Sequence, residues 1–474
     1  MKMREIILWL CLILSTLNAY SIEVEVAGEL NKIITDKSVT ELAVQGKIDA
    51  RDLKFIVEEL SNLENLDLSK AEIVAYKSTA PCFGDVLEYF ANKLPDYCFF
   101  DKDYKTVLLP SSLSYIGEAA FAGCDNITKV ICPENLDSIG NYAFSSCGRL
   151  EGVTFNAGIK KIGAGAFAKC AKLKSLDLSV IDTNCDFEKG VFAGCTSLET
   201  VTIGNQVTDI SVSMFAGCTM LKTINLGANP ILKSIGEDAF ASTALTAFDL
   251  SACTQLKVIG RWAFAGVQLV EIVLPANIES IGEGAFFYNE SLNDIAIPAS
   301  VEKIEGYTFN GNTSLATILL PATLVYVGTR AFEDNTGMTN ITLEAENVPE
   351  LGENVFAGVD QSNVELKVPN ESVLLYKWAE QWQEFNIIGD ISTIEDFIVE
   401  ENAVKAYFED KILNVIAKNE ISQVMVYESN GVCLVSAKPL SESIQIEMST
   451  MGGRMYVVHI KLVNGKEKTF KLIR

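Results

Sequence analysis

Phenylalanine recurs along the middle of the chain at a nearly constant step. Around several members of the series the neighbouring sequence recurs as well, as in Ile116-Gly117…Ala120-Phe121. A fixed period of this length is typical of a solenoid, in which each unit buries its apolar side chains only by stacking on the next, and not of a compact enzyme. Successive members lie 22 to 25 residues apart, and they are Phe121, Phe144, Phe167, Phe192, Phe215, Phe240, Phe264, Phe286, Phe309, Phe332 and Phe356.

A short alternation of apolar and polar residues follows each phenylalanine and predicts one strand per coil. The pattern is clear in Leu198-x-x-Val201-x-Ile203, and proline follows several of these segments, where it can end a ladder. Stacked coils would place the strands ~4.8 Å apart in a parallel sheet over a continuous apolar core. The prolines are Pro110, Pro133, Pro275, Pro298 and Pro321.

The repeat unit reads Leu-x-x-Ile-x-Leu-Pro-x-x-(Leu/Ile/Val)-x-x-Ile-Gly-x-x-Ala-Phe and recurs from about residue 94 to residue 368. This unit resembles the BspA type of leucine-rich repeat. The resemblance implies an α/β repeat solenoid with one parallel strand in each coil of ~23 residues. Because related proteins are implicated in adhesion to host matrix and to other cells, it also implies a secreted or cell-surface binding protein, an adhesin.

Residues 1–21 have the features of a secretory signal peptide. Lys2 and Arg4 precede an apolar run from Ile6 to Leu14, and Ala19 and Ser21 are small residues at candidate cleavage positions. Nine apolar residues are too few for a membrane span, which needs ~20. We therefore expect this segment to be cleaved and the chain to be exported.

Residues 22–93 resemble the amino-terminal cap of the same family and include its first leucine-rich strand, Leu63-x-x-Leu66-x-Leu68. Asp49 is expected to cap a helix within this segment. The solenoid spans residues 94–389, and an aromatic-rich stretch at 372–385 resembles the family's closing helix. Trp378 and Trp382 of that helix are expected to be packed.

The last segment, residues 390–474, changes character. Alternating apolar stretches separated by Asn430-Gly431, Gly452-Gly453 and Asn464-Gly465 predict hairpins and an all-β, sandwich-like domain. This tail resembles the carboxy-terminal sorting domain of the type IX secretion system. The resemblance implies the secretion machinery as a partner and the outer cell surface as the location, with the periplasm as the alternative.

The composition excludes several kinds of function. The formal charge is −24 and no basic run occurs, whereas nucleic acids and anionic membranes are bound by clustered Lys and Arg. The single histidine, His459, lies in a strand-like run of the tail, so neither a Ser-His-Asp or Cys-His nucleophile site nor a histidine-rich zinc site can form within the repeats. We expect no enzyme, catalytic residue, metal or cofactor; an enzyme would need a site built from carboxylates or cysteines alone.

Cysteine occupies one repeat position in five successive coils, three residues after the phenylalanine. Later coils fill that position with Thr243, Val267, Asn289, Asn312, Asn335 and Val359. A position that accepts such residues is expected to be a small buried slot whose polar occupants bond the loop backbone; a zinc or redox column is the alternative. Cys82 and Cys98 flank an irregular loop and are the pair most suited to a disulfide in an oxidising compartment. The five cysteines are Cys124, Cys147, Cys170, Cys195 and Cys218.

Two sets of residues are candidates for binding. The first is the central part of the row expected to point outward from the strands, Asp177, Thr202, Asn225 and Asp249, which would form a hydrogen-bonding stripe or merely a solvated sheet. The second set is aromatic: Trp262 and Tyr307 share a repeat position with Gly284 between them, and Phe287 and Tyr288 replace the usual Ala-Gly. These rings would stack on sugars, grip a peptide, or fill uneven bends. The complete outward row is Ile131, Thr154, Asp177, Thr202, Asn225, Asp249, Val273, Ala296, Leu319 and Thr342.

The function favoured by these features is a binding protein that uses the solenoid to hold a host matrix protein, a cell-surface protein or glycan, or another cell. A passive structural or surface-layer protein, or a periplasmic scaffold, is the alternative. The surface positions vary without a motif, so the sequence does not name the ligand.

Overall fold

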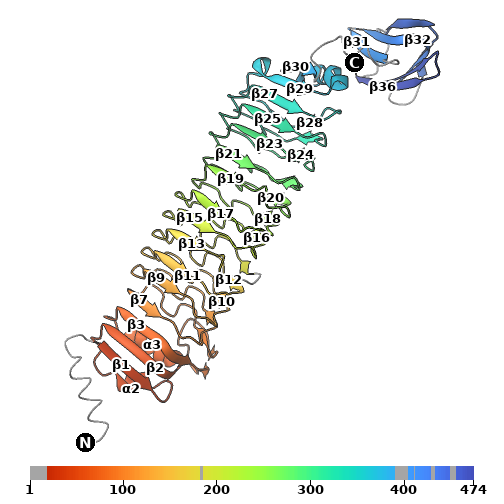
Figure 1. The fold of residues 1–474 in the computed structure, drawn as a ribbon. Helices are drawn as coiled ribbons and strands as arrows, with labels where there is room; N and C mark the ends of the chain where they lie inside the picture. Colours follow the sequence, from red (N-terminus) through yellow and green to blue (C-terminus); the bar gives the residue numbers. More distant parts are fainter. Residues whose placement is uncertain are drawn as a thin grey trace, which may run out of the picture.

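The computed structural model describes residues 19–181, 185–389, 404–409, 411–428, 433–448 and 455–473. Most of the expected signal peptide lies outside these ranges, while Ala19–Ser21 form the first half of strand β1 (Ala19–Val24). Residues 19–389 form a long stack of coils (Figure 1). Among the helices of the described ranges, none has the length and apolar character that a membrane span requires.

The amino-terminal cap is a parallel sheet with a helix against it. Asp49 caps α3 as predicted, because its carboxylate accepts a hydrogen bond from the Arg51 N–H while the Asp52 carboxylate accepts one from the Asp49 N–H. Leu53 and Ile56 of this helix are fully buried, so the helix covers the end of the apolar core. The cap comprises β1, α2 (Leu30–Ile33), β2 (Glu41–Ile48), α3 (Ala50–Glu59) and β3 (Asn65–Ile73), and its sheet ends in β7 (Thr106–Leu108).

Each coil contributes two strands, not the single strand expected, and the strands of neighbouring coils pair in parallel. The longer strands are β9 (Lys129–Ile131), β11 (Gly152–Thr154), β13 (Ser175–Asp177), β15 (Thr200–Thr202), β17 (Thr223–Asn225), β19 (Ala247–Asp249), β21 (Glu271–Val273), β23 (Asp294–Ala296), β25 (Thr317–Leu320), β27 (Asn340–Leu343) and β29 (Glu365–Val368). The shorter ones are β6 (Lys93–Leu94), β8 (Tyr115–Ile116), β10 (Ser138–Ile139), β12 (Lys161–Ile162), β14 (Asp186–Phe187), β16 (Asp209–Ile210), β18 (Ser234–Ile235), β20 (Val258–Ile259), β22 (Ser280–Ile281), β24 (Lys303–Ile304), β26 (Tyr326–Val327) and β28 (Glu350–Leu351).

Turns, not helices, connect these strands. The described residues between 65 and 360 contain no helix, and the helices α2, α3 and α4 belong to the two caps. The α/β label of the predicted fold class therefore fits the solenoid poorly, whereas the parallel repeat solenoid is confirmed.

The repeat phenylalanines form one stacked column through the core. Twelve rings from Phe99 to Phe356 follow one another, with ring centroids 5.0 to 5.8 Å apart. All twelve side chains are buried. The distance between neighbouring coils thus matches the distance at which aromatic rings stack, so each repeat of the sequence adds one ring to the column.

Two residues of every coil adopt a left-handed backbone conformation, two positions before and two positions after the phenylalanine. In the coil of Phe264 they are Trp262 (φ +53°) and Gly266 (φ +64°). Glycine adopts this conformation freely, and a bulky residue does so at a cost of roughly 1–3 kcal/mol. Aromatic residues at such positions are therefore held there by their surroundings.

Glycine follows the short strand because neighbouring coils approach closely there. A Cβ on Gly260 would lie 2.6 Å from the backbone nitrogen of Glu237. Ser211 and Glu305 occupy this position in two other coils, and the short-strand ladder is broken at both, between β14 and β16 and between β22 and β24. Glu188 occupies it in a third coil, where the ladder continues. Two of these three replacements thus coincide with a break between coils.

The carboxy-terminal cap is not the single helix expected at 372–385. Gln381 has a φ of +63°, which an α-helix cannot continue through. Trp382 is buried, contacts Phe356 edge-on at 5.2 Å and donates a hydrogen bond to the Pro349 carbonyl, whereas Trp378, also expected to be packed, is 47% exposed. The cap comprises η1 (Gln361–Asn363), η2 (Asn370–Ser372), α4 (Val373–Lys377), η3 (Trp382–Glu384) and β30 (Asn386–Gly389), which pairs in parallel with β29.

The carboxy-terminal domain is one curved antiparallel sheet, so the all-β expectation is confirmed and the sandwich is wrong. The first half of β32 pairs with β31 and β34, and its second half pairs with β33 and β35. β36 contacts β31, which brings the sheet close to a barrel. The expected turn Asn464-Gly465 joins β35 to β36, while Asn430-Gly431 and Gly452-Gly453 lie outside the described residues. The strands are β31 (Val404–Glu409), β32 (Ile412–Glu428), β33 (Cys433–Ala437), β34 (Ser441–Glu447), β35 (Met455–Leu462) and β36 (Glu467–Ile473).

Candidate functional site

The row of residues expected to point outward from the long strands does so. Eight of its ten members are exposed, and Thr202 and Thr342 are half-buried. The alternation of the strand places Leu176, Val201 and Ile224 of the same strands toward the core. The row therefore forms one outer surface that the packing of the solenoid does not use.

Three of the four polar candidates are neighbours on this surface. Asp177 pairs with Thr202, and Thr202 pairs with Asn225, in the sheet of β13, β15 and β17. Asp249 is in the next ladder, where it pairs with Val273, because β17 and β19 are not hydrogen-bonded to each other. The stripe is thus a set of three residues followed by a break and then Asp249.

The two aspartates of the stripe also hold turns. Oδ1 of Asp177 accepts hydrogen bonds from the backbone N–H (2.9 Å) and the hydroxyl (2.5 Å) of Ser179. The Ser251 N–H donates to Oδ1 of Asp249 at 2.9 Å, and the bonds from Ser251 hold the pKa of that carboxyl below its usual value. Asp67 and Ser69 form the same turn in the cap. One carboxylate oxygen of each stripe aspartate therefore stabilises a turn, while both aspartates remain exposed residues.

A second outward column, which the sequence analysis did not name, lies beside the first. Ser175, Thr200 and Thr223 begin the same three strands and are in register with one another. With Asp177, Thr202 and Asn225 they form a plate of six hydrogen-bonding side chains, two from each strand. The signal was present in the sequence, because residues i and i+2 of a strand share a face.

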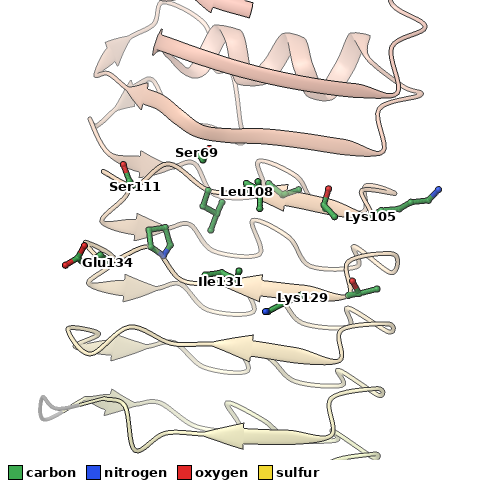
Figure 2. Close-up of a pocket in the computed structure, with 12 residues that line it drawn as sticks. Ser69, Lys105, Leu108, Ser111, Lys129, Ile131 and Glu134 are labelled. Atoms are coloured by element: carbon green, nitrogen blue, oxygen red, sulfur yellow. The ribbon is translucent and has the colours of Figure 1, made fainter. Parts of the chain in front are cut away.

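An apolar hollow of about 380 Å³ lies on the same surface nearer the amino terminus, between β7 and β9 (Figure 2). These two strands are not paired with each other, since β7 belongs to the cap sheet and β9 pairs with β11. Leu108 and Ile131, which are 46% and 53% exposed, lie in the hollow. Lys105 and Lys129 are at one end, and Glu134 is at the other (Figure 2). Leu108 was not among the predicted binding residues.

The four aromatic candidates form one cluster. The Trp262 and Phe287 rings meet edge-on with centroids 5.0 Å apart, Trp262 and Tyr307 are 6.4 Å apart, and Phe287 and Tyr288 are 4.4 Å apart. A Cβ on Gly284 would overlap the Trp262 ring, so this ring lies over the glycine of the next coil. Tyr288 is exposed and the other three rings are half-buried. The rings of the cluster therefore pack between neighbouring coils and also leave part of their surface exposed to solvent.

The cysteine position is the buried slot that the sequence predicts. In all five coils the thiol donates a hydrogen bond to the carbonyl of the preceding coil's phenylalanine, at 3.0 to 3.2 Å. Asn289 and Asn335 donate to the same carbonyl at 2.8 Å. Among the described residues, no group of His, Cys, Asp and Glu side chains is arranged to hold a metal ion. The slot links successive coils.

The slot thiols are expected to resist alkylation in the native protein. Burial raises the pKa of the Cys124 thiol to about 12 and also raises the pKa of the Cys147 thiol, so the reactive thiolate of these two is scarce at pH 8, and all five slot thiols are closed to solvent. Brief treatment with iodoacetamide followed by peptide mass spectrometry should label the exposed Cys433 and leave the slot unmodified until guanidinium unfolds the chain. Rapid native labelling of the slot, or labelling that depends on a zinc chelator, would instead support the metal or redox column.

Cys82 and Cys98, the candidate pair for a disulfide, are not joined in the structure, where both are free thiols. Cys98 is fully buried in the core beside Phe99, whereas Cys82 lies in a half-exposed loop where its carbonyl accepts a hydrogen bond from Lys54. His459 lies half-exposed in β35, as expected, with Nδ1 2.8 Å from the Thr469 hydroxyl and Nε2 3.4 Å from Glu467.

Several solved structures are similar to this chain. A leucine-rich repeat protein from Bacteroides ovatus is 20% identical over 74% of this chain and 85% of its own, with a TM-score of 0.45. A leucine-rich cell surface protein from Faecalibacterium prausnitzii is 22% identical over 67% of this chain and 88% of its own, with a TM-score of 0.37. The pneumococcal vaccine antigen PcpA is 18% identical over 61% and 70%, with a TM-score of 0.30. Among curated proteins there is no significant match.

A family model for the BspA-type leucine-rich repeat region matches residues 92–222, 139–267, 185–312 and 233–365. The overlapping matches cover more than half of the chain, and they coincide with the coils that carry the stacked phenylalanines, the cysteine slot and the outward row. The chain therefore belongs to the BspA-type leucine-rich repeat family.

Proposed function

We propose that this chain is a secreted or cell-surface binding protein, an adhesin, that holds a protein or glycan partner on the outer surface of its long-strand sheet. BspA-type repeat proteins are surface proteins that mediate protein binding. The observation that carries the proposal is the arrangement of the outer surface. The polar plate of β13, β15 and β17 lies between the apolar hollow at Leu108 and Ile131 and a distal apolar stretch at Val273 and Leu319.

The energetic argument rests on residues that folding does not explain. A leucine or isoleucine half exposed on the outer face of a sheet adds nothing to the core, and burying it against a partner would contribute about 1.5–3 kcal/mol. The plate supplies hydroxyl, amide and carboxylate groups at the spacing of the strands, which suits the backbone of a partner protein or the hydroxyl groups of a glycan. Together these patches supply both the apolar area and the hydrogen-bonding groups that protein interfaces use.

The test is a binding screen of the full chain against immobilised host matrix proteins and glycans, repeated with Asp177, Thr202, Asn225 and Asp249 all changed to alanine. We expect the fourfold variant to lose at least tenfold in affinity for its partner while it keeps its circular dichroism spectrum. The reason is that several hydrogen bonds across one interface contribute about 0.5–1.5 kcal/mol each.

A matched control is available because Asp36 accepts hydrogen bonds from the backbone N–H and the hydroxyl of Ser38, as Asp177 does from Ser179. Asp36→Ala therefore removes the same kind of turn outside the outer surface and should keep full affinity. Unchanged binding by the fourfold variant would overturn the plate as the site. If Trp262→Gly then lost binding, the aromatic cluster would be the site, and a screen without any partner would favour a passive surface-layer or scaffold protein.

We also propose that residues 390–474 are a sorting domain of the type IX secretion system and that residues 1–21 are a signal peptide, so that the solenoid faces the outside of the cell. The support is the sequence resemblance of the tail together with its all-β structure. The secretion machinery would then be a partner of the tail, independent of what the repeats bind.

A further inference from the structure

The segment between the cap and the first complete coil, residues 78–92, lies outside the repeat yet is well organised. Strands β4 (Tyr76–Lys77) and β5 (Glu88–Tyr89) pair as a small hairpin. The Tyr89 hydroxyl accepts hydrogen bonds from the N–H groups of Cys82 (2.7 Å) and Phe83 (2.9 Å) and donates one to the Val86 carbonyl (2.7 Å). An ordered insertion that supplies no strand to the solenoid is typical of a binding loop.

This insertion forms one wall of a hollow of about 460 Å³, and β6, β8 and the turn after β6 form the other. Phe90 and Tyr97 present open rings and are 56% and 47% exposed. Tyr97 is held in a left-handed backbone conformation (φ +59°), with its hydroxyl bonded to Glu118 at 2.8 Å. The lining side chains that matter here are Phe90, Tyr97 and Tyr115 together with Asp85, Glu88 and Lys93.

The hollow already holds a cation over its rings. Lys93 Nζ lies 5.2 Å from the centre of the Phe90 ring and 5.5 Å from that of Tyr115, which is the geometry of a cation–π contact. Lys93 forms no ion pair within the described part of the chain, and neither do Asp85 and Glu88, although all three line the hollow. The Phe90 and Tyr115 rings therefore already bind the ammonium group of Lys93. The carboxylates of Asp85 and Glu88 line the same hollow without an ion-pair partner among the described residues.

We propose that this hollow binds an arginine or lysine side chain of a basic partner protein. The rings would cover the flat faces of a guanidinium group, and Asp85 and Glu88 would accept its N–H groups. The net charge of −24 favours a basic partner at longer range. Lys93 occupies the position that the incoming cation would take, so it acts as a resident competitor. The site is separate from the outer surface of the long-strand sheet, so the proposal stands independently of that surface.

Isothermal titration calorimetry of the full chain tests this with two probes: a capped glycine-rich peptide containing two arginines, and the same peptide with citrulline, which keeps the shape but lacks the charge. We expect the arginine peptide to bind at least fivefold more tightly. Lys93→Met should raise its affinity at least threefold, because the competitor and its like charge are removed. Phe90→Leu should lower the affinity about fivefold while keeping an apolar side chain.

Lys222→Met is the matched control, since it makes the same change in net charge at an exposed lysine far along the chain and should leave the affinity unchanged. Equal gains from Lys222→Met and Lys93→Met would show attraction by overall charge and overturn the proposal. Equal binding of the citrulline peptide, or full affinity in Phe90→Leu, would overturn it as well. Binding of a neutral hexasaccharide in place of the arginine peptide would assign the hollow to glycans instead. Because Lys93 and Phe90 are exposed, both variants should keep the native melting temperature.

Discussion

Replacing Phe264 with alanine should lower the free energy of unfolding by about 3–5 kcal/mol. The ring is fully buried and stacks between Phe240 and Phe286, with centroid distances of 5.4 and 5.6 Å, and it also meets Phe248 edge-on at 6.1 Å. The short-strand ladder β18-β20-β22, the pairing of β19 with β21 and the hydrogen bond from Asn289 to the Phe264 carbonyl hold the neighbouring coils at a fixed spacing, so they cannot collapse into the space that the ring leaves. The measurement is urea unfolding of the full chain followed by circular dichroism.

The same experiment should show a loss of cooperativity, because a solenoid is stabilised by contacts between neighbouring coils and a weak interface divides it into two blocks. The control is Phe287→Ala, an aromatic side chain of equal size that is half-buried outside the column and should cost about 1 kcal/mol. A change of less than about 1 kcal/mol in Phe264→Ala, with a single unchanged transition, would mean that the column does not hold the stack together.

Deleting residues 395–474 should abolish exposure of the protein at the cell surface. If the tail is the sorting domain, the truncated chain crosses the inner membrane by its signal peptide and then stays in the periplasm. Fractionation of cells that make each form, followed by treatment with external protease, measures this directly. The expected result is a protease-sensitive full-length chain and a protected truncated chain.

A fusion of residues 390–474 to a folded periplasmic reporter with its own signal peptide is the matched control and should reach the surface. Surface exposure of the truncated chain would show that the tail is not needed for sorting. If both the full-length and the truncated chain are protected from protease, the tail has no role in sorting. The protein would then be a periplasmic scaffold and not an adhesin.

The core could be predicted from the sequence because its signals are local and repeated. The phenylalanine period fixes which residues stack, and the alternation after each phenylalanine fixes which side chains face outward. The slot was also predictable, since Cys124 and Asn289 share little except small size and a group able to donate a hydrogen bond to one carbonyl.

Features that depend on the fit between two coils could not be predicted in the same way. The short strands are only two residues long and show no periodicity. Their ladder is open at the coils of Ser211 and Glu305 but continues at the coil of Glu188, so the type of residue at this position does not by itself tell where the ladder breaks. The expected closing helix is interrupted, since α4 ends at Lys377 and Gln381 takes a left-handed conformation. The candidate pair Cys82 and Cys98 is not joined, because Cys98 lies in the core and Cys82 lies in a half-exposed loop.

The aromatic hollow beside residues 78–92 could not be predicted from the sequence for a related reason. Residues 78–92 break the repeat, and an irregular segment carries no period from which the directions of its side chains follow. Only the bonds to the Tyr89 hydroxyl and the cation over Phe90 show that this insertion is a built structure.

The interrupted ladders have a consequence for a molecule under tension. β21 is not paired with β23, and β22 is not paired with β24, so both ladders are open at the same junction between coils. Bonds through the phenylalanine turns continue across it, as from the Phe286 N–H to the Thr308 carbonyl at 2.9 Å. If the chain is held at one end and pulled at the other, force passes from coil to coil along the stack. This junction would yield first, and the molecule would lengthen while the blocks on either side stay folded.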